Sequence, residues 1–344
     1  MTETDLAAAV KAAVDEWMRV TPLKQQQAEL ANPAVLSASL GSAVEALLVA
    51  GGFVMGAARQ VVLAASYFHL KDVFVPGDLP DTPQSFIPVP SGVGVNAGCA
   101  AVLAVHGFLR METVSYGAEN GGDLFVNLVP MPGQGKFPEK SKKSMRGHTD
   151  GVSFPFNGDV DASNPRIAPS PDLVTLVGLR NPNEVPTKVM VLEHVLAELS
   201  EADKAELKKR QYSITAQATF AQGTKLLLGR VHVAVDEPIL KVGVEGTHVR
   251  YSHSSVVPTR VGGPAEKASE NFEAACNKVV TSVVVRPGDV LVVSNRLCLH
   301  GRGVVGDDVG GQARWLLRTY GLDTTNLATN RRHLGARPLH VLYP

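Results

Sequence analysis

Residues 294–306, SNRLCLHGRGVVG, place His300 directly after an apolar stretch, and Arg314 follows fourteen residues later in ARWLLRTYGL (313–322). The preceding VVVRPGDVLVV joins a PGD turn signal to a β-branched run of strand length. The second apolar run predicts a return strand, on which Arg314 and Arg318 face the same side because side chains alternate. This order of strand, histidine, loop, strand and arginine is what a barrel needs to aim both kinds of group at its interior.

A second motif, His148-Thr149-Asp150, lies far upstream. In an extended segment residues i and i+2 point to one side, so His148 and Asp150 can bind the same metal ion. Two imidazoles and one carboxylate hold one face of an octahedral Fe(II) and leave three positions open. Each motif alone is weak evidence, because about one His-x-acid is expected by chance; a polar turn and an ordinary histidine are the alternatives. The combination with a distant arginine favours a non-haem iron oxygenase.

With these motifs, the chain resembles the clavaminate synthase-like branch of the Fe(II)/2-oxoglutarate dioxygenases, which includes arginine and asparagine β-hydroxylases within the taurine dioxygenase-like superfamily. The similarity extends to KDVFVPGDLP (71–80), YGAENGGDLFVNLVP (116–130) and TKVMVLEHVLAELSEADKAELKKR (187–210). The resemblance implies a mainly β fold with added helices. Its core would be a double-stranded β-helix (a cupin-like jelly roll) flanked by N-terminal and inserted α-helices.

The resemblance also implies roles for individual residues. His148, Asp150 and His300 would bind Fe(II). Arg314 would pair with the far carboxylate of the co-substrate 2-oxoglutarate, assisted by the hydroxyl of Thr187, because arginine offers a charged fork that matches a carboxylate. The alternative for Thr187 is a strand threonine with no such role. O2 would be the second co-substrate.

Three further residues are assigned to the amino-acid substrate by the same resemblance. Arg318 would hold its α-carboxylate, and Asn120 would place an amide against it, although an ordinary turn asparagine is an equal alternative in ENGG. Glu245 is the carboxylate in VEGTHVRYSH, where the arginine hydroxylase binds a guanidinium; a solvated surface glutamate is the alternative. Asp150 is one methylene shorter than the glutamate of several relatives, so recognition of the substrate amine is expected to differ.

Residues 156–172, FNGDVDASNPRIAPSPD, are longer than the matching connection in those relatives. Their composition predicts a loop, and a loop next to a metal motif is a candidate lid. An insertion without function is the alternative. Asp159 or Asp161 from this loop would offer Arg318 a protein carboxylate if no substrate carboxylate binds there.

Composition indicates a soluble, cytoplasmic enzyme. The 344 residues include thirty-three basic and thirty-three acidic side chains, without a basic tract that would favour nucleic acid or an anionic membrane as partner. Cys99, Cys276 and Cys298 have no metal or disulfide spacing, and Cys298 is expected to be a buried apolar residue. The N-terminus predicts no signal peptide. Glycines and charges interrupt the hydrophobic residues 43–66, which predict buried helices rather than a membrane span.

The chain is expected to form a single domain over residues 1–344, with a helical part at 1–70 and the jelly-roll core at 71–344. Hydrophobic periodicity predicts where its elements lie. The expected helices are 5–19, beginning at Thr4 or Asp5, 34–67 with a break near the glycines, 98–108, 190–210 and 264–281, and the expected strands include 173–181 and those within 223–253.

The function expected from this resemblance is hydroxylation of a free L-amino acid, at the β-carbon or a neighbouring carbon, with release of succinate and CO2. A substrate tethered to a carrier protein, or a carboxylate that is not an amino acid, is the alternative within the enzymes. A non-catalytic metal-binding jelly roll would not need Arg314 and Thr187. A halogenase would need a small residue in place of Asp150, so that alternative is disfavoured. Modification of an amino acid in secondary metabolism fits this chemistry, and the oligomeric state stays open.

Overall fold

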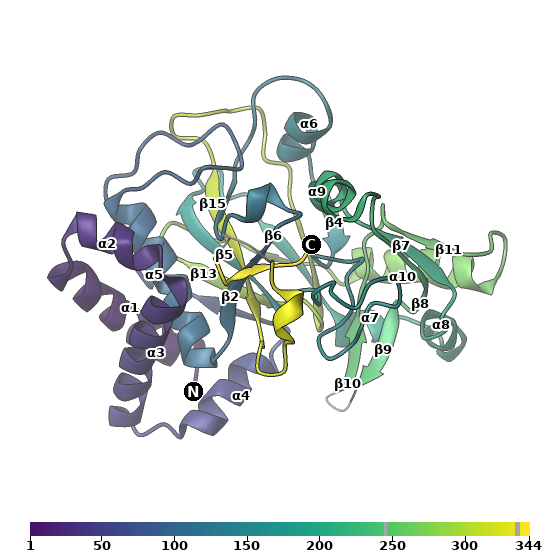
Figure 1. Ribbon diagram of the computed structural model, residues 1–344, viewed down its shortest axis with the longest axis horizontal. Coiled ribbons are helices and arrows are strands. Elements are labelled where there is room, and N and C mark those ends of the chain that lie inside the picture. The colour runs from purple at the N-terminus through teal and green to yellow at the C-terminus, as the bar shows by residue number, and fades with distance from the viewer. Residues whose placement is uncertain (244–245, 334–337) are drawn as a thin grey trace.

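Two antiparallel sheets form the centre of the computed structural model, which describes residues 1–243, 246–333 and 338–344 (Figure 1). The larger sheet has the order β1-β13-β5-β15-β2-β16, with β3 also paired to β15, and the smaller has the order β12-β6-β14-β4. Only the short β16 pairs in parallel, with β2. The bounds of the larger sheet are β1 Tyr67–Leu70, β2 Glu112–Tyr116, β3 Val126–Leu128, β5 Leu173–Arg180, β13 Val290–Ser294, β15 Trp315–Leu322 and β16 Val341–Leu342. Those of the smaller sheet are β4 Met145–His148, β6 Thr187–Val191, β12 Thr281–Val283 and β14 Cys298–Arg302.

The chain passes back and forth between these two sheets. From β3 to β6 successive strands alternate between the larger and the smaller sheet, and from β12 to β15 they alternate again. The metal motifs therefore lie on paired strands of the smaller sheet, while Arg314 directly precedes β15 of the larger sheet. The prediction of a mainly β fold is confirmed in part, because helices accompany the sheets over much of the chain.

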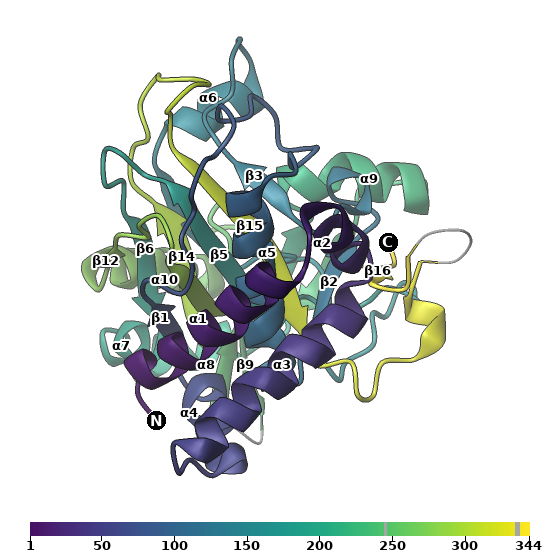
Figure 2. The same ribbon diagram turned by 90° about the vertical axis from the view of Figure 1, so that its left-hand side faces the viewer.

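The N-terminal helices cover the outer face of the larger sheet (Figure 2). Their bounds are α1 Glu3–Val20, α2 Leu23–Leu30, α3 Pro33–Ala50, α4 Met55–Leu63 and α5 Val93–Leu109. Helix α5 is buried almost along its whole length, since it lies between the sheet and the other helices. The predicted break at the glycines is confirmed, whereas α1 begins earlier than expected, at the capping box formed by Thr2 and Asp5.

Helix α3 is long and apolar enough to cross a membrane by length and composition alone, with 39% of that window buried. The helix packs on α5. The prediction of buried helices at 43–66 is met only in part, because Val44 and Leu48 are the buried residues in the second half of α3. Two glycines bring the helices into backbone contact: a Cβ added at Gly41 would lie 2.4 Å from the carbonyl carbon of Gly107. A Cβ at Gly107 would lie 1.9 Å from the carbonyl oxygen of Ser37, whose own hydroxyl donates to the carbonyl of Leu103 at 2.8 Å. This contact is what seats α3 on the core.

The second half of the chain inserts a layer between β6 and β12, seen on the right of Figure 1. It contains a three-stranded sheet of order β11-β7-β8 and the hairpin β9-β10. The bounds are α7 Leu192–Ala197, α8 Glu201–Leu207, β7 Tyr212–Thr215, α9 Ala218–Leu228, β8 Val233–Glu237, β9 Leu240–Gly243, β10 Gly246–Val249, β11 Val256–Pro258 and α10 Pro264–Lys278. The remaining short helices are η1 Asn120–Gly122, α6 Lys136–Lys142 and η2 Thr329–Arg331.

Strands β8, β9 and β10 and helix α10 confirm predictions for this layer, whereas the helix predicted at 190–210 is the two helices α7 and α8, with Ser200 as the N-cap of the second. A further prediction fails at residues 223–228. The strand predicted there is wrong, because these residues are the second half of helix α9. The buried residues of α9 are Phe220 and Thr224, spaced four apart as a helix requires, and apolar Leu227 and Leu228 continue the same side against the core. The run LLLG carries no alternation that would distinguish a strand from this helix end.

The contact between α3 and α5 generates a stability prediction. Gly107→Ala should lower the free energy of unfolding by about 3 kcal/mol, because the new methyl group meets a backbone carbonyl that moves only with the whole helix. Chemical denaturation monitored by circular dichroism measures the change. Gly56→Ala in α4 is the matched control: its Cβ would have no neighbour within 4 Å, so stability should stay the same or rise by up to about 1 kcal/mol. Equal stability of both variants would contradict the close contact.

Candidate functional site

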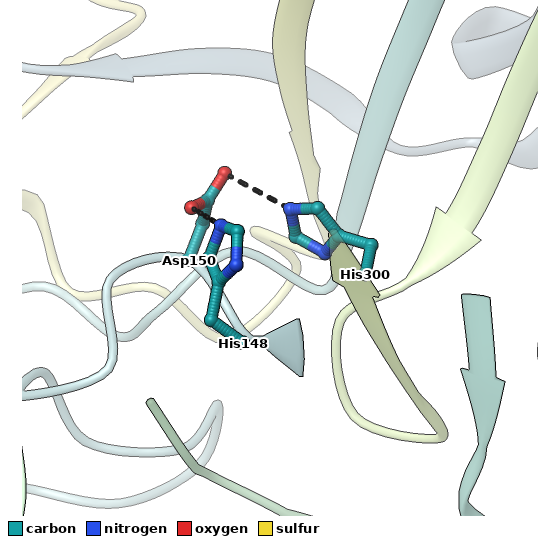
Figure 3. Close-up of side chains that lie close together, drawn as sticks. All are labelled: His148, Asp150 and His300. Atoms are coloured by element: carbon teal, nitrogen blue, oxygen red, sulfur yellow. Dashed lines mark ion pairs between the residues drawn. The ribbon is translucent and has the colours of Figure 1, made fainter. Parts of the chain in front are cut away.

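His148, Asp150 and His300 come together from segments 150 residues apart (Figure 3). One ligand atom from each residue lies within 4.8 Å of the others. The Nε2 atoms of His148 and His300 lie 3.5 Å and 3.7 Å from the two carboxylate oxygens of Asp150. Strands β4 and β14 create this arrangement because they pair in antiparallel register with His148 directly opposite His300. A tight cluster of two imidazoles and one carboxylate, open on one side to a cavity, is a donor set suited to a divalent iron ion.

The turn that carries Asp150 is held on both sides. The amide of Asn295 accepts a hydrogen bond from the backbone N–H of Asp150 at 2.8 Å and donates to its carbonyl at 2.9 Å. The amide of Gln217 donates to the carbonyl of Thr149 and accepts from the N–H of Gly151, both at 3.0 Å. These bonds fix the backbone on either side of the carboxylate, as ligand-orienting contacts do in metal sites.

The electrostatics of the cluster keep its groups ready to bind a cation. Burial opposes ionisation of Asp150, yet the guanidinium of Arg318 and hydrogen bonds from both histidines hold the pKa of its carboxyl well below the usual range. Burial and the neighbouring His148 lower the pKa of His300, which favours the neutral, metal-binding imidazole. The Nδ1 of His148 lies 3.0 Å from the carbonyl of Arg146, an arrangement that leaves Nε2 to face Asp150.

A cavity of about 130 Å³ adjoins the cluster. Helix α9 and its preceding residue contribute Gln217, Ala218 and Thr219, and α6 contributes Phe137, Lys140 and Ser141. The remaining lining residues are Phe86, Leu128, Val129, Met145, His148, Asp150, Leu176, Thr187, His300, Gly301, Arg302, Arg314 and Arg318. All the predicted metal ligands and both predicted arginines therefore face one space, together with Thr187.

Arg314 lines one part of this cavity with Thr187 and Arg302. Arg314 is 5% exposed, and its side chain has no hydrogen bond or ion pair within the described residues, its Nε included. Burial and the nearby Arg302 lower the pKa of Arg314 to about 9. Thr187 is paired directly opposite Arg302 across β6 and β14. A buried guanidinium without an acid is costly, so this part of the cavity is suited to a carboxylate ligand.

Arg318 is instead matched by protein carboxylates. Its guanidinium lies 2.7 Å from Glu119 and 3.4 Å from Asp150. Tyr320 donates its hydroxyl to the same oxygen of Glu119 at 2.9 Å, while the other oxygen of Glu119 is buried without a partner among the described residues. Burial works against the charge of Arg318, but Glu119 and Asp150 raise its pKa above the ordinary value. The expected alternative partners do not contact Arg318: Asp159 pairs with Lys241 and Asp161 with His232.

Other predicted residues lie elsewhere. Asn120 occupies the turn η1 and does not line the cavity; the adjacent Glu119 makes the contact with Arg318 instead. Glu245 lies outside the described residues. Residues 156–172 form an irregular segment, as expected, and contribute nothing to the cavity lining, so the lid assigned to them stays a prediction. Cys298 is fully buried with apolar neighbours, which confirms the expectation for it.

The sequence alone did not single out Glu119, Gln217 or Arg302; it placed Asn295 beside His300 at the barrel mouth but gave it no role. Asn295 was visible at the end of its strand, two residues beyond a buried run, and Arg302 lies two residues beyond His300, so strand alternation places it on the same side. Glu119 and Gln217 gave no local signal, because each acts on a segment far away in the chain.

Comparison with known proteins agrees with this geometry. No family model matches the chain. An L-lysine 3-hydroxylase of Catenulispora acidiphila is 23% identical over 245 residues, which are 70% of this chain and 63% of that relative. The crystal structure of an asparagine oxygenase with Fe(II), a hydroxyasparagine and succinate has a TM-score of 0.74 and 18% identity, covering 98% of this chain and 97% of that one. The non-haem iron oxygenase OrfP with Fe and α-ketoglutaric acid gives 0.73 and 20% over the same shares.

The chain thus has the fold of the non-haem iron oxygenases. Within that class it is similar to oxygenases named for amino acids, which confirms the resemblance that the sequence predicted. The curated relative extends beyond the matched region, since the alignment spans 63% of its length.

The geometry of the cluster generates a prediction about metal binding. His148→Ala and His300→Ala should each weaken Fe(II) binding at least about a hundredfold, because two ligands cannot hold the ion as three do. Anaerobic calorimetry, and the visible charge-transfer band formed with 2-oxoglutarate, measure the effect. His194→Ala, on the exposed side of α7, is the control and should bind like the unaltered protein. Unchanged bands in both ligand variants would contradict the assignment.

Proposed function

We propose that this protein is an Fe(II)/2-oxoglutarate-dependent dioxygenase that hydroxylates a free L-amino acid at the β-carbon or a neighbouring carbon. Succinate and CO2 are the co-products. The observation that carries the proposal is the shared cavity, in which the cluster of His148, Asp150 and His300 faces the buried, unpaired Arg314. The relatives with this fold carry Fe, α-ketoglutaric acid or succinate in their structures.

His148, Asp150 and His300 are the proposed ligands of Fe(II). When bound, the ion supplies activation of O2, coupled to oxidative decarboxylation of 2-oxoglutarate and insertion of one oxygen atom into a substrate C–H bond. The protein holds the three ligands on one side and leaves the side facing the cavity open. Asn295 bonds the backbone of Asp150 itself, and Gln217 bonds the backbone of the residues on either side, so the turn that carries the carboxylate is held in place.

Arg314 and Thr187 are the proposed site for the far carboxylate of 2-oxoglutarate. The guanidinium offers two parallel N–H donors, and the threonine hydroxyl offers one more. A carboxylate that binds here replaces the missing partner of Arg314 and relieves its repulsion from Arg302. The resulting orientation presents the 2-oxo acid end of the co-substrate to the metal cluster.

Arg318 and Glu119 are the proposed contacts for the two charges of a free amino acid. The guanidinium of Arg318 lies between the metal carboxylate and Glu119, where an α-carboxylate can share its donors. Glu119 has a buried oxygen without a partner among the described residues, which suits an α-ammonium group. Held at both charges, a substrate turns its side-chain carbons closest to the backbone toward the metal cluster. Asn120, Glu245 and the lid at 156–172 remain predictions for this site.

The same proposal covers the architecture and surroundings of the enzyme. Strands that alternate between the two sheets, as β3 to β6 and β12 to β15 do, are the pattern of a double-stranded β-helix. We infer one jelly-roll domain over residues 1–344, with the helices of residues 1–70 as its cover. The substrate is a small molecule, without a nucleic-acid or membrane partner, and the enzyme is soluble and cytoplasmic.

The two arginines are separated by conservative variants. Arg314→Lys keeps the charge but loses the two parallel donors of the guanidinium. The dissociation constant of 2-oxoglutarate should therefore rise roughly thirtyfold, which is a loss of about 2 kcal/mol of binding free energy. Arg318→Lys should leave that constant nearly unchanged and weaken binding of the amino acid. Anaerobic titrations of the Fe(II) enzyme measure both constants. Should Arg318→Lys impair 2-oxoglutarate binding while Arg314→Lys does not, the two roles are reversed.

A panel of amino acids tests the reaction itself. In air, a free L-amino acid should couple succinate release to a product sixteen mass units heavier, which is one oxygen atom, while its methyl ester should not, because the ester has lost the carboxylate that Arg318 binds. Mass spectrometry of the amino acid and assay of succinate measure the coupling. Equal coupling with the ester, or turnover confined to carrier-bound aminoacyl groups, would remove the free amino acid from the proposal.

A further inference from the structure

The charges around the cavity are strongly unequal. Lys140, Arg302, Arg314 and Arg318 contribute four cationic side chains to its lining, whereas Asp150 is the one carboxylate that the described chain contributes there. Asp150 is moreover committed to the metal cluster. The flanking strands β9 and β10, on either side of Glu245, contribute no residue to the lining.

Two of the four cations have an anionic partner or are given one by the proposed function. Arg318 is matched by Glu119, whose carboxylate lies 2.7 Å from its guanidinium. Arg314 is matched by the far carboxylate of 2-oxoglutarate, while the near carboxylate and Asp150 balance the charge of Fe(II). The α-carboxylate and α-ammonium of an amino acid cancel each other. Lys140 and Arg302 therefore stay positive without a matching acid.

Arg302 is held by neutral groups. Its guanidinium donates to the backbone carbonyls of Lys140 at 2.7 Å and Lys143 at 3.1 Å, and its buried Nε has no partner among the described residues. Arginine keeps its charge at neutral pH, so Arg302 contributes a cation to the wall of the cavity. Through the two carbonyls, Arg302 also anchors the end of α6 that carries Lys140.

Lys140 lies at the rim of the cavity and has no ion pair within the described residues. Lys140 is an exposed residue whose side chain lines the same cavity as Asp150. The ammonium is therefore within electrostatic reach of the metal carboxylate, and its flexible stem can follow a ligand into the cavity.

This field discriminates among amino-acid side chains. A lysine-like or arginine-like side chain would enter a space where the described residues present two unmatched positive charges and no carboxylate that is not already engaged, and an unpaired cation is costly away from water. An acidic side chain would be attracted during entry and matched once bound. The similar oxygenase OrfP carries hydroxyarginine or L-canavanine in its structures, and the 23% identical relative is named for lysine. The cationic lining of this cavity favours a side chain of the opposite charge.

We propose that the substrate is an L-amino acid with an acidic side chain, of the aspartate or glutamate class, and that Lys140 is the residue that selects the acid. The inference rests on the proposed function, since it assumes that an amino acid and 2-oxoglutarate share the cavity. It adds the charge of the substrate and a specificity-determining residue outside the metal and co-substrate contacts.

Binding of amino acids that match in shape but differ in charge tests the proposal. Calorimetry of the anaerobic Fe(II) enzyme, with 2-oxoglutarate saturating so that acids cannot take its place, compares aspartate with asparagine, glutamate with glutamine, and lysine with arginine. At least one acid should bind about tenfold more tightly than its amide, and the cationic amino acids should bind more weakly than both. Tighter binding of lysine or arginine than of either acid would overturn the proposal.

Lys140→Met tests the assigned residue, with Lys143→Met directly after the same helix as control, because Lys143 is largely exposed and does not line the cavity. Lys140→Met should weaken binding of the preferred acid about fivefold and leave its amide unchanged, as expected for a partly exposed charge. Lys143→Met should change neither. Equal losses for acid and amide, or a weaker affinity for 2-oxoglutarate in place of the acid, would overturn the role of Lys140.

A second pair of variants adds a negative charge to the positively charged cavity. Thr219 lines the cavity in the first turn of α9, where an acid is favoured by the helix dipole. Thr219→Asp should weaken acid binding and improve lysine binding relative to Thr219→Asn, which has the same shape without the charge. An identical preference in the two variants would overturn the electrostatic argument.

Two failures can be distinguished. If Fe(II) and 2-oxoglutarate bind but no free amino acid does, the proposed function itself fails. If amino acids bind without a preference for acids, only this inference fails.

Discussion

The antiparallel pairing of β4 with β14 is the constraint on which the site depends. It places His148 opposite His300, so two segments 150 residues apart deliver their imidazoles to one point. A slip of the register by one residue would turn one histidine to the other face of the sheet. Asp150 adds to this pair because the turn that follows β4 is fixed by Asn295, which itself lies just beyond β13 on the neighbouring sheet. Both sheets must therefore be in place before the three ligands meet.

Besides the cluster of His148, Asp150 and His300, the cavity is marked by buried arginine side chains in its lining. Arg318 on β15 and Arg314 just before it both line the cavity. Burial of a charged guanidinium is costly, and the two arginines differ in whether the protein supplies an acid to offset that cost. Arg318 is surrounded by Glu119, Tyr320 and Asp150, all supplied by the protein. Arg314 has no acid of its own within the described residues, so its stability improves when a carboxylate arrives. A carboxylate that binds at Arg314 would therefore gain an ion pair without breaking one that the described residues already make.

The sequence predicted the positions of the candidate site residues where local spacing determines which way a side chain points. His148 and Asp150 lie two residues apart, His300 follows a buried strand, and Arg314 precedes another, so alternation alone predicted that they face inward; Thr187 came from the family resemblance. The same reasoning missed Glu119, because its contact with Arg318 is made only when the turn after β2 meets β15. It also placed a strand where the end of α9 lies, since a short apolar run does not reveal its period. Contacts between segments far apart in the chain, such as that of Glu119 with Arg318, could not be predicted from local spacing.

Gln217 joins two parts of the molecule that would otherwise be independent. The residue immediately precedes α9, which lines the cavity, and its amide bonds to the backbone on both sides of Asp150. Any displacement of the start of α9 by a ligand therefore strains or relaxes the turn that holds the carboxylate. In the proposed function, binding of a ligand under α9 and binding of an ion at the cluster would therefore share a coupling free energy. Such coupling is reciprocal, so the ion alters the affinity for that ligand by the same factor by which the ligand alters the affinity for the ion.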